Sequence, residues 1–542
     1  MRQELPWYRT AVVYQIYPRS FKDSNGDGVG DLPGIIEKLD YLHDLGIGAI
    51  WLSPVYKSPM RYFGYDISDH CAIDPLFGTM EDFDRLVAEA HGLGIRIMMD
   101  YVPNHTSDQH PWFLESRASR ENPKRNWYIW ADPKVDTAPA GRNRDQLQPP
   151  NNWLSVFGGS GWESDEKTGQ YYFHTFLKQQ PDLNWRSPEV GAAMKAVLKF
   201  WLDRGVDGFR VDAVHWLVKD AKLRDNPPNP DFAPGSMDPY HALLQQYTQG
   251  QEETLSILKE LCQFLDGFGE KFMVTELHAG IEEMARYYRV CGNGRHSPFN
   301  FNLIGMPWRV DAYRKFITEF EASLKPYDWP NYVLGNHDQP RVASRLGLER
   351  ARLAAMLQFT LRGMPFIYYG EEIGMVDGLI PHELVRDQYE KNVPGMKLGR
   401  DPERTPMQWN ALEYAGFSTS QPWLPVSENY THVNAEAEFA DTRSVLALYK
   451  NLIKLRQDSP ALLFGRFEPL VLADEEVFAY MREGEGERVA VLLNFSDQAR
   501  AITLPAETGT MLLTTYMDRP AGEAAHLRNF LLRPHEGYII KI

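Results

Sequence analysis

One short segment carries an arginine and an aspartate two residues apart. Residues 208–214 (GFRVDAV) form a run of β-forming residues that contains Arg210 and Asp212. Side chains two positions apart on a strand point to the same face, so the guanidinium lies beside the carboxylate and favours its ionised form. A charged aspartate at the end of a buried strand has the chemistry of a nucleophile, although an isolated Arg-x-Asp is more often a structural ion pair.

Polar residues also follow three other apolar runs of the chain. Asn104 and His105 end one run, Glu276 ends a second, and His337 and Asp338 follow a third. Each has an ordinary explanation by itself, since an aspartate can cap a helix and a histidine beside an asparagine is usually a structural hydrogen-bonding group. Three acids and two histidines that converge on one face of a fold instead favour a catalytic site.

Three carboxylates with an arginine fit the hydrolysis of glycosidic bonds. One carboxylate must stay charged to attack an oxocarbenium-like carbon, and another must be protonated near neutral pH to donate to the leaving oxygen. Asp212, beside Arg210, suits the charged role. Glu276, with Val274 and Leu277 close by and no cation next to it in sequence, suits the protonated role. No Cys- or His-rich ligand set predicts a transition-metal site.

The segments that must position these side chains alternate between strands and helices. A helix that begins at Ser187, a candidate cap, has Pro188 in its first turn and ends at Gly205, just before the Arg210 strand. Helical patterns also cover residues 32–45 and 80–91. The alternation predicts a (β/α)8 TIM barrel, an α/β fold whose active sites lie at the carboxyl ends of the strands. The strands are expected at residues 11–17, 48–52, 95–101, 208–214, 272–276, 299–302, 332–334 and 365–369.

Three regions depart from this alternation. Residues 105–173 are irregular and rich in Pro, Gly, Asn and Trp, which predicts an inserted domain (domain B) after the third strand. A second insertion, residues 225–251, begins with DNPPNP after the fourth strand. Short strand-like runs near the end predict a C-terminal β-sandwich over residues 461–542. Residues 1–104 and 174–460 then form the barrel.

Composition limits the partners and the compartment of this 542-residue chain. Its net charge of −16 argues against nucleic acid and anionic membranes as partners. The N-terminal segment lacks the pattern of a signal peptide and no apolar run is long enough to span a bilayer, so we expect a cytoplasmic protein. Cys71, Cys262 and Cys291 are few and scattered, and they predict neither a disulfide framework nor a thiolate metal site. The oligomeric state stays open.

Residues 23–31 (DSNGDGVGD) place oxygen-bearing side chains at alternate positions around a tight turn at Gly28. This spacing resembles the first part of a calcium loop. The loop is no EF-hand, because Gly34 stands where the closing glutamate would be and Pro33 interrupts the geometry. We expect a structural calcium ion here, with a solvated acidic turn as the alternative.

Several ordered motifs resemble one known family over the whole chain. DYVPNH, GFRVDAV, VTEL and LGNHDQPR are similar to the main sequence regions of the α-amylase family of glycoside hydrolases (glycoside hydrolase family 13). IGAIWLSP, QPDLNW and GMPFIYYGEEIGM are similar to its subsidiary regions. Within that family, QPDLN resembles the branch of oligo-1,6-glucosidases and α-glucosidases.

The resemblance implies a role for each acid and for the loop. In a retaining mechanism Asp212 would be the nucleophile, oriented by Arg210, and Glu276 would be the general acid and base. Asp338 would be the third carboxylate, which holds sugar hydroxyls and supports distortion of the ring. The implied calcium ligands are Asp23, Asn25, Asp27, Val29 through its carbonyl, and Asp31.

The resemblance also implies a set of sugar-binding residues. His105 and His337 would hydrogen-bond the sugar in the terminal subsite, and Tyr65 would stack on it. Asp66, paired with Arg404 of RTPMQW, would grip the non-reducing end and so enforce exo action.

Substrate linkage depends in this branch on the residue after the nucleophile. Valine there accompanies α-1,6 linkages and threonine accompanies α-1,4 linkages, whereas this chain has Ala213. We expect short α-1,4-linked substrates such as maltose, with activity on α-1,6 bonds or sucrose left open. The alternatives are a transglucosylase or a sugar isomerase of the trehalose or isomaltulose synthase type. A non-catalytic ectodomain of the transporter heavy-chain type is a remote alternative, because it would need a membrane span and would tolerate loss of the acids.

Overall fold

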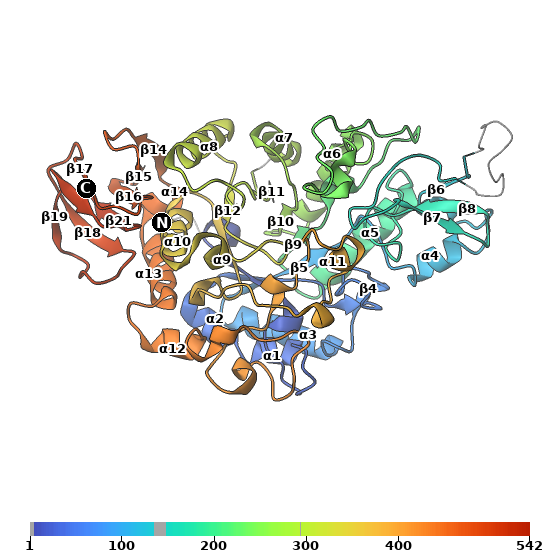
Figure 1. The fold of residues 1–542 in the computed structure, drawn as a ribbon, viewed down its shortest axis with the longest axis horizontal. Helices are drawn as coiled ribbons and strands as arrows, with labels where there is room; N and C mark the ends of the chain where they lie inside the picture. The colour runs from blue at the N-terminus through green and yellow to red at the C-terminus, as the bar shows by residue number, and fades with distance from the viewer. Residues whose placement is uncertain (1–4, 135–147, 293) are drawn as a thin grey trace.

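A barrel of eight parallel strands occupies the centre of the computed structural model, which describes residues 5–134, 148–292 and 294–542 (Figure 1). The hydrogen-bonded order is β11-β10-β9-β5-β2-β1-β13-β12, so strands that follow one another along the chain are also neighbours in the sheet. The predicted TIM barrel is confirmed. Its strands are β1 (Val13–Ile16), β2 (Ala49–Leu52), β5 (Arg96–Tyr101), β9 (Gly208–Val211), β10 (Phe272–Thr275), β11 (Ser297–Pro298), β12 (Asn331–Val333) and β13 (Met364–Tyr368).

Alternate residues of these strands point inward and form an apolar layer. Trp51, Met98 and Phe272 belong to this interior cluster, whereas Phe209 packs in the outer cluster with the helices. The same alternation carries Arg210 inward, with its guanidinium carbon 5.3 Å from the centre of the Trp51 ring. The barrel interior thus changes from apolar to charged toward the carboxyl ends of the strands.

The sixth strand differs from its predicted position and leaves a seam in the barrel. β11 covers Ser297–Pro298 instead of residues 299–302. Beyond it the Phe299 N–H still donates to the Thr275 carbonyl of β10, at 2.8 Å. In the described part of the chain no backbone ladder joins β11 to β12. The buried side chain of Asn331 spans this seam: its Nδ2 donates to the Pro298 carbonyl at 2.7 Å, and its Oδ1 accepts from the Asn300 N–H at 2.9 Å.

Helices surround the barrel largely as predicted. α5 (Pro188–Asp203) ends before Gly205, whose φ of 95° favours glycine. Ser187 does not cap α5, because its hydroxyl donates to Glu189 Oε2 at 2.6 Å. Residues 32–45 form two helices, since the backbone at Lys38 leaves the helical region.

In the described ranges no helix is long and apolar enough to cross a membrane. The helices are α1 (Leu32–Ile36), α2 (Leu39–Leu45), α3 (Met80–Gly92), α6 (Glu252–Asp266), α7 (Ile281–Cys291), α8 (Val310–Ser323), α9 (Val342–Leu346), α10 (Leu348–Thr360), α12 (Ala435–Ala440), α13 (Val445–Asp458) and α14 (Pro460–Phe464).

Two long segments leave the barrel after β5 and β9 and contact each other. The first contains α4 (Pro111–Ser116) and a three-stranded sheet of β6 (Trp130–Ala131), β8 (Gln170–Phe173) and β7 (Trp162–Asp165), at the right of Figure 1. The second is irregular, with one short 3-10 helix at Pro239–Ala242. Asn152 in the first exchanges two hydrogen bonds of 2.8 Å with the backbone of Asn226 in the second.

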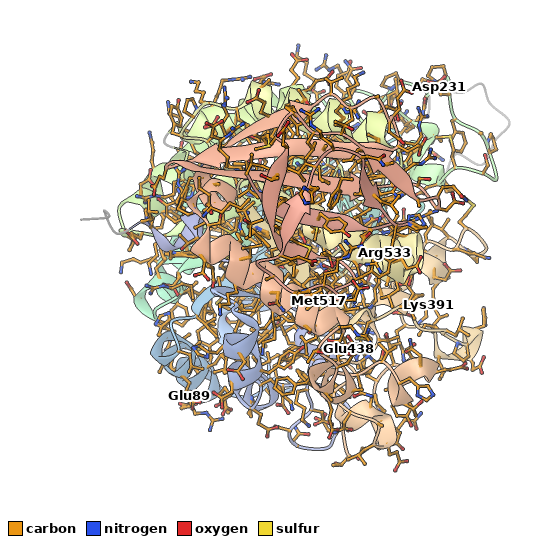
Figure 2. The ribbon with its side chains drawn as sticks, turned by 90° about the vertical axis from the view of Figure 1, so that its left-hand side faces the viewer. Glu89, Asp231, Lys391, Glu438, Met517 and Arg533 are labelled. Carbon is orange, nitrogen blue, oxygen red and sulfur yellow. A yellow bond between two sulfur atoms is a disulfide. The ribbon has the colours of Figure 1, made fainter. Side chains whose placement is uncertain are left out.

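The C-terminal region is a β-sandwich. It lies at the left of Figure 1 and faces the viewer in Figure 2, where Met517 and Arg533 are labelled. A six-stranded antiparallel sheet and a two-stranded sheet share an apolar cluster. Phe495 stacks on Trp308 near α8 at 4.2 Å, which helps to fix the sandwich to the barrel. The larger sheet comprises β14 (Arg466–Leu470), β15 (Val477–Gly484), β16 (Glu487–Asn494), β21 (Gly537–Lys541), β18 (Thr508–Thr514) and β19 (Ala524–His526), and the smaller comprises β17 (Arg500–Ile502) and β20 (Phe530–Leu532).

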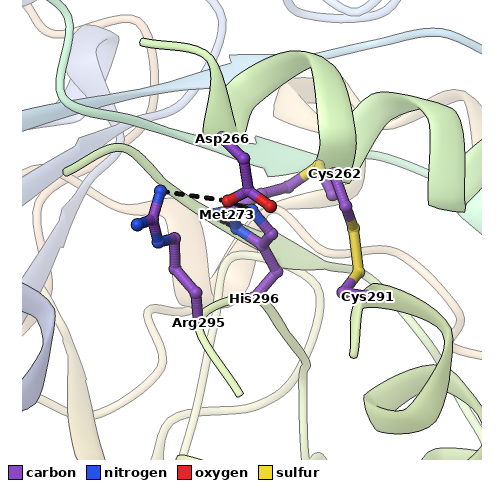
Figure 3. The surroundings of a disulfide bond; sticks show 6 residues. All are labelled: Cys262, Asp266, Met273, Cys291, Arg295 and His296. Atoms are coloured by element: carbon purple, nitrogen blue, oxygen red, sulfur yellow. Dashed lines mark hydrogen bonds and ion pairs between the residues drawn. A yellow bond between two sulfur atoms is a disulfide. The ribbon is translucent and has the colours of Figure 1, made fainter. Parts of the chain in front are cut away.

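A disulfide bond joins two of the three cysteines, contrary to the sequence-based expectation. Cys262 on α6 and Cys291 on α7 are bonded, with Cα atoms 5.7 Å apart (Figure 3). They lie 29 positions apart in sequence and meet only because α6 packs against α7, which their spacing does not reveal. Cys71 is free. The bond ties together the two helices that precede and follow β10, the strand that Glu276 directly follows.

Removal of this crosslink should destabilise the protein. We expect Cys262→Ser to lower the free energy of unfolding by about 3 kcal/mol, because a crosslink across 29 positions restricts the unfolded chain. Denaturant unfolding without reductant measures this, with Cys71→Ser as the matched control. Thiol titration of the denatured wild-type protein should find the single thiol of Cys71. Titration of all three cysteines would contradict the bond.

Candidate active site

A single arginine lies between two of the predicted acids, Asp212 and Glu276, and a third acid, Asp100, that was not among the predicted site residues. Arg210 is 1% exposed, and its Nη1 lies 2.8 Å from Asp100 Oδ1 and 2.6 Å from Asp212 Oδ1. Its Nη2 lies 2.9 Å from Glu276 Oε2. The three carboxylates come from β5, β9 and β10 or from the residue that follows, and these strands are adjacent. One cation therefore compensates part of the charge of three buried acids.

The charges of the catalytic pair differ from the sequence-based expectation. Burial raises the pKa of Asp212 well above its usual range, Arg210 opposes this shift, and the charge of Glu276 adds to it. Burial acts in the same direction on Glu276, but Arg210, aided by His278 and the Ala213 amide, outweighs it and lowers the pKa of Glu276. No cation is next to Glu276 in sequence, but in the fold Arg210 reaches it from the neighbouring strand.

A bend directly after Asp212 brings a backbone donor to Glu276. β9 ends at Val211, and Ala213 adopts a left-handed conformation with φ 50° and ψ 36°. Few residues other than glycine adopt it. The bend points the Ala213 N–H at Glu276 Oε2, at 2.8 Å. Since Arg210 also binds Oε2, this oxygen has two donors, and Oε1 is left to face His278 Nε2 at 3.6 Å.

Asp338 lies between two further arginines. Its Oδ1 is 2.9 Å from Arg400 Nη1 and 2.7 Å from Arg404 Nη2. Arg404 is buried and also donates through Nε to the His337 carbonyl at 2.7 Å. The predicted pairing of Arg404 with Asp66 is therefore wrong: Arg404 binds the third carboxylate.

Asp66 has a structural role in this fold. It is fully buried and accepts hydrogen bonds of 2.9 Å from the N–H groups of Arg61 and Tyr62. The Ser58 hydroxyl donates to it at 3.0 Å. Burial raises the pKa of Asp66 to about 6. These contacts close the turn that precedes Tyr65, and they direct the Asp66 carboxylate away from the cavity.

Tyr65 connects the predicted sugar-binding residues. Its hydroxyl lies 2.7 Å from His337 Nε2 and 3.1 Å from Asp100 Oδ2, and its ring stacks on that of His337. His105 Nε2 lies 3.0 Å from the Gln180 amide nitrogen in the QPDLN motif. Burial lowers the pKa of both histidines to about 4. Both rings are therefore neutral near pH 7, and each can accept a hydrogen bond as well as donate one.

Six of the nine predicted catalytic and sugar-binding residues line one cavity of about 710 Å³. Arg210 lies beneath it, and Asp66 and Arg404 lie behind its wall and do not line it. The predicted residues that line the cavity are Tyr65, His105, Asp212, Glu276, His337 and Asp338.

Several lining residues are absent from the sequence-based set. Arg400 lies against the rings of Tyr62, Phe157 and Tyr389, with its guanidinium carbon between 5.1 and 5.6 Å from their centres. Arg400 stands four residues before Arg404, just outside the motif RTPMQW. The aromatic residues gave no such signal, because Tyr62 and Phe157 lie in turns and Tyr389 lies in a helix of only five residues, α11 (Gln388–Asn392).

The predicted calcium ligands lie in one loop that does not line the cavity. Asp23 Oδ1 accepts from the N–H groups of Asn25 and Gly26, at 3.0 and 2.7 Å. Asp27 Oδ1 accepts from the Val29 N–H at 2.8 Å. The side chains offer oxygen donors of the type that calcium prefers. In the described residues no three or more His, Cys, Asp or Glu side chains form a group that could hold a metal ion. Calcium binding stays a prediction.

Comparison with known proteins agrees with the fold and with the family resemblance of the sequence motifs. Residues 15–465 match the family described as Alpha amylase, catalytic domain, and residues 467–539 match Maltogenic Amylase, C-terminal domain. The chain is 39% identical to an oligo-1,6-glucosidase of Parageobacillus thermoglucosidasius, over 99% of each chain. It is 42% identical to a probable alpha-glucosidase of Rhizobium meliloti (strain 1021), over 92% of this chain and 91% of that protein.

Solved structures extend the similarity. The crystal structure of the alpha-glucosyl transfer enzyme XgtA superposes with a TM-score of 0.90 at 39% identity, over 99% of this chain and 100% of the other. The trehalulose synthase MutB from Pseudomonas mesoacidophila MX-45 superposes with a TM-score of 0.88 at 37% identity and the same coverage. Since the family match covers most of the chain and the relatives align along almost all of it, the chain belongs to the α-amylase family, glycoside hydrolase family 13, and is a glycoside hydrolase.

Proposed function

We propose that this glycoside hydrolase is an exo-acting, retaining α-glucosidase that releases glucose from the non-reducing end of short α-glucosides, with α-1,4-linked substrates such as maltose preferred. The observation that carries the proposal is that the Arg210 guanidinium forms ion pairs with both Asp212 and Glu276. Two carboxylates that bind the same guanidinium must lie close together. Retaining glycosidases need such closeness, with a separation of about 5 Å.

The first displacement forms a covalent glucosyl-enzyme. Asp212 attacks the anomeric carbon, the bond to the leaving oxygen breaks, and Glu276 gives its proton to that oxygen. This step requires Glu276 to be protonated and Asp212 to be ionised. A bound glucoside favours that state, because its bridging oxygen accepts a hydrogen bond only from a protonated carboxyl group. The positive charge that develops at the anomeric carbon favours an ionised Asp212.

The second displacement releases glucose. A water molecule gives a proton to Glu276 and attacks the anomeric carbon from the side that the leaving group vacated, and the bond to Asp212 breaks. Each step inverts the configuration, so the product keeps the α form. Arg210 and the Ala213 N–H, which bind Glu276 Oε2, favour the charged base that this step requires.

The walls of the cavity support action at a chain end. Phe157 comes from domain B, Asp238 from the second insertion, and Arg400 from the segment before Arg404. The Tyr389 hydroxyl donates to Asp238 and so joins two of these walls. Walls on several sides leave room for a terminal sugar at the acids rather than for a chain that continues in both directions.

A second candidate is transfer of the glucosyl group to another sugar. The solved relatives include a protein named as an alpha-glucosyl transfer enzyme and a trehalulose synthase. Transfer uses the same glucosyl-enzyme, with a sugar hydroxyl in place of water.

A non-catalytic role is disfavoured, because all three predicted acids are present and bound to arginines: Asp212 and Glu276 to Arg210, and Asp338 to Arg404.

Product analysis with maltose, isomaltose, sucrose and trehalose tests the proposal. We expect the highest kcat/KM for maltose, and proton NMR early in the reaction should show the α-anomer of glucose first. Appearance of the β-anomer first would rule out the double displacement. Conversion of sucrose mainly into an isomeric disaccharide would favour the transfer reaction.

Substitution of the catalytic pair should remove turnover while the fold persists. We expect Asp212→Asn and Glu276→Gln each to lower kcat on maltose by about 10³-fold or more, because each removes a charge state that the other cannot supply. Asp231→Asn, at an exposed position of the second insertion, is the matched control (Figure 2). Azide should restore turnover to Asp212→Ala and Glu276→Ala as glycosyl azides of opposite anomeric form. Near-native activity in Asp212→Asn would contradict its assignment as nucleophile.

The loop at residues 23–31 should bind calcium. Its carboxylates repel one another without a cation, so excess chelator should lower the Tm, and a site saturated at 100 times Kd is worth about 2.7 kcal/mol. Asp27→Ala should show the lowered Tm without chelator and no further change with it, whereas the exposed Asp44→Ala should behave as the wild type. An unchanged melting curve, with no metal found by elemental analysis, would favour a solvated turn.

A further inference from the structure

We infer that His278 is a positioning residue for Glu276. Its Nε2 faces Oε1, the carboxylate oxygen that gives and takes the proton, and it thereby influences the pH at which Glu276 loses that proton. The inference rests on the proposed function, because it assigns Glu276 the role of acid and base. His278 stands two residues after Glu276, in the loop that leaves β10, and it lines the cavity.

The two oxygens of Glu276 have different surroundings. Oε2 accepts from the Ala213 N–H at 2.8 Å and lies 2.9 Å from Arg210 Nη2. With two donors it is poorly placed to carry a proton. Oε1 lies 3.6 Å from His278 Nε2 and faces the cavity that both residues line. A movement of about half an ångström, or a bridging water, would make this contact a hydrogen bond.

The barrel interior holds the His278 ring in place. It stacks on Phe301 at 4.8 Å with an interplanar angle of 26°. Phe301 is buried in the apolar cluster inside the barrel. Asn302 donates to the Ala279 carbonyl at 3.2 Å and so fixes the loop next to His278. The side chain is nevertheless 48% exposed and lines the cavity, so solvent can reach it.

The other groups that face Glu276 come from β9, from the strands beside it, and from the turn after Asp212. Arg210 binds Glu276 directly, and Asp212 and Asp100 share that arginine. His215 lies 6.4 Å from His278 between ring centres, and burial lowers its pKa to about 3, so it stays neutral. Among these neighbours of Glu276, His278 has substantial access to solvent. An N–H donated by its Nε2 to Oε1 favours the charged form of Glu276.

Removal of the donor should therefore extend acid catalysis to higher pH. Without it the charged form of Glu276 is less favoured, so Glu276 keeps its proton to a higher pH. In His278→Phe we expect the basic limb of the kcat/KM profile on maltose to move up by about one pH unit. His278→Gln, which keeps a donor, should move it by less than half as much. His526→Phe, at an exposed position of β19, is the control and should leave the limb in place.

A second substrate separates this role from a general structural one. α-Glucosyl fluoride needs little protonation of its leaving group, so its profile should move little in His278→Phe while that of maltose moves. An unmoved limb on maltose, equal shifts in the Gln and Phe variants, or an equal shift on the fluoride would each overturn the inference and leave the α-glucosidase assignment intact. A wild-type protein inactive on every α-glucoside would overturn both. If His278→Phe does not fold, the same comparison is made with His278→Ala.

Discussion

The structure depends most on the burial of one guanidinium among three carboxylates. Arg210 is 1% exposed, and neither it nor Asp100, Asp212 and Glu276 could be buried alone without a large cost in solvation free energy. The compensation works only if β5, β9 and β10 keep their register, in which Asp100 pairs with Arg210 and Val274 pairs with Arg210 from the other side. A slip by one residue would turn these side chains toward the apolar outer layer. The register of the barrel and the chemistry of the site therefore require each other.

A second ion cluster surrounds the rest of the cavity. Asp338 is bound by Arg400 and Arg404, and Arg400 is bound in turn by Asp387 at 3.0 Å. The buried histidines beside these ions stay neutral, which avoids adding charge to a site that must accommodate an uncharged sugar. The cavity thus combines fixed, paired charges at the acids with neutral donors and acceptors around them, and this arrangement suits recognition of hydroxyl groups.

The extent of sequence-based prediction can be judged from particular residues. The meeting of Asp212 and Glu276 could be predicted from the amino-acid sequence, since parallel strands end at one face of a barrel. Two contacts that were not predicted join segments whose relative position the sequence does not fix: Arg404 with Asp338, and Cys262 with Cys291. The contact of Arg210 with Glu276 joins adjacent strands, but the sequence does not show how far the guanidinium reaches. Asp66 was assigned to the sugar by resemblance, whereas local backbone donors hold it in a turn.

The insertions show a different limit of such prediction. Their length and position indicate that they wall the active site, but irregular chain has no periodicity from which side-chain direction can be derived. Phe157 of domain B is therefore found at the cavity only in the folded chain. Ala213 shows the same limit at a single residue, because strand alternation continues to Asp212 and then stops at a left-handed bend.

The seam between β11 and β12, closed by Asn331, is the place where neighbouring strands of the barrel separate most easily. Elsewhere neighbouring strands separate only by breaking a backbone ladder, whereas β11 and β12 are bridged by the amide of one side chain. Local opening therefore has its lowest free energy along this line, and amide hydrogen exchange there should be faster than along β9 or β10. The seam separates the strand that precedes Asp338 from those that carry Asp212 and Glu276. Opening along the seam would therefore move Asp338 relative to the catalytic pair, while the ladder between β9 and β10 keeps the pair together.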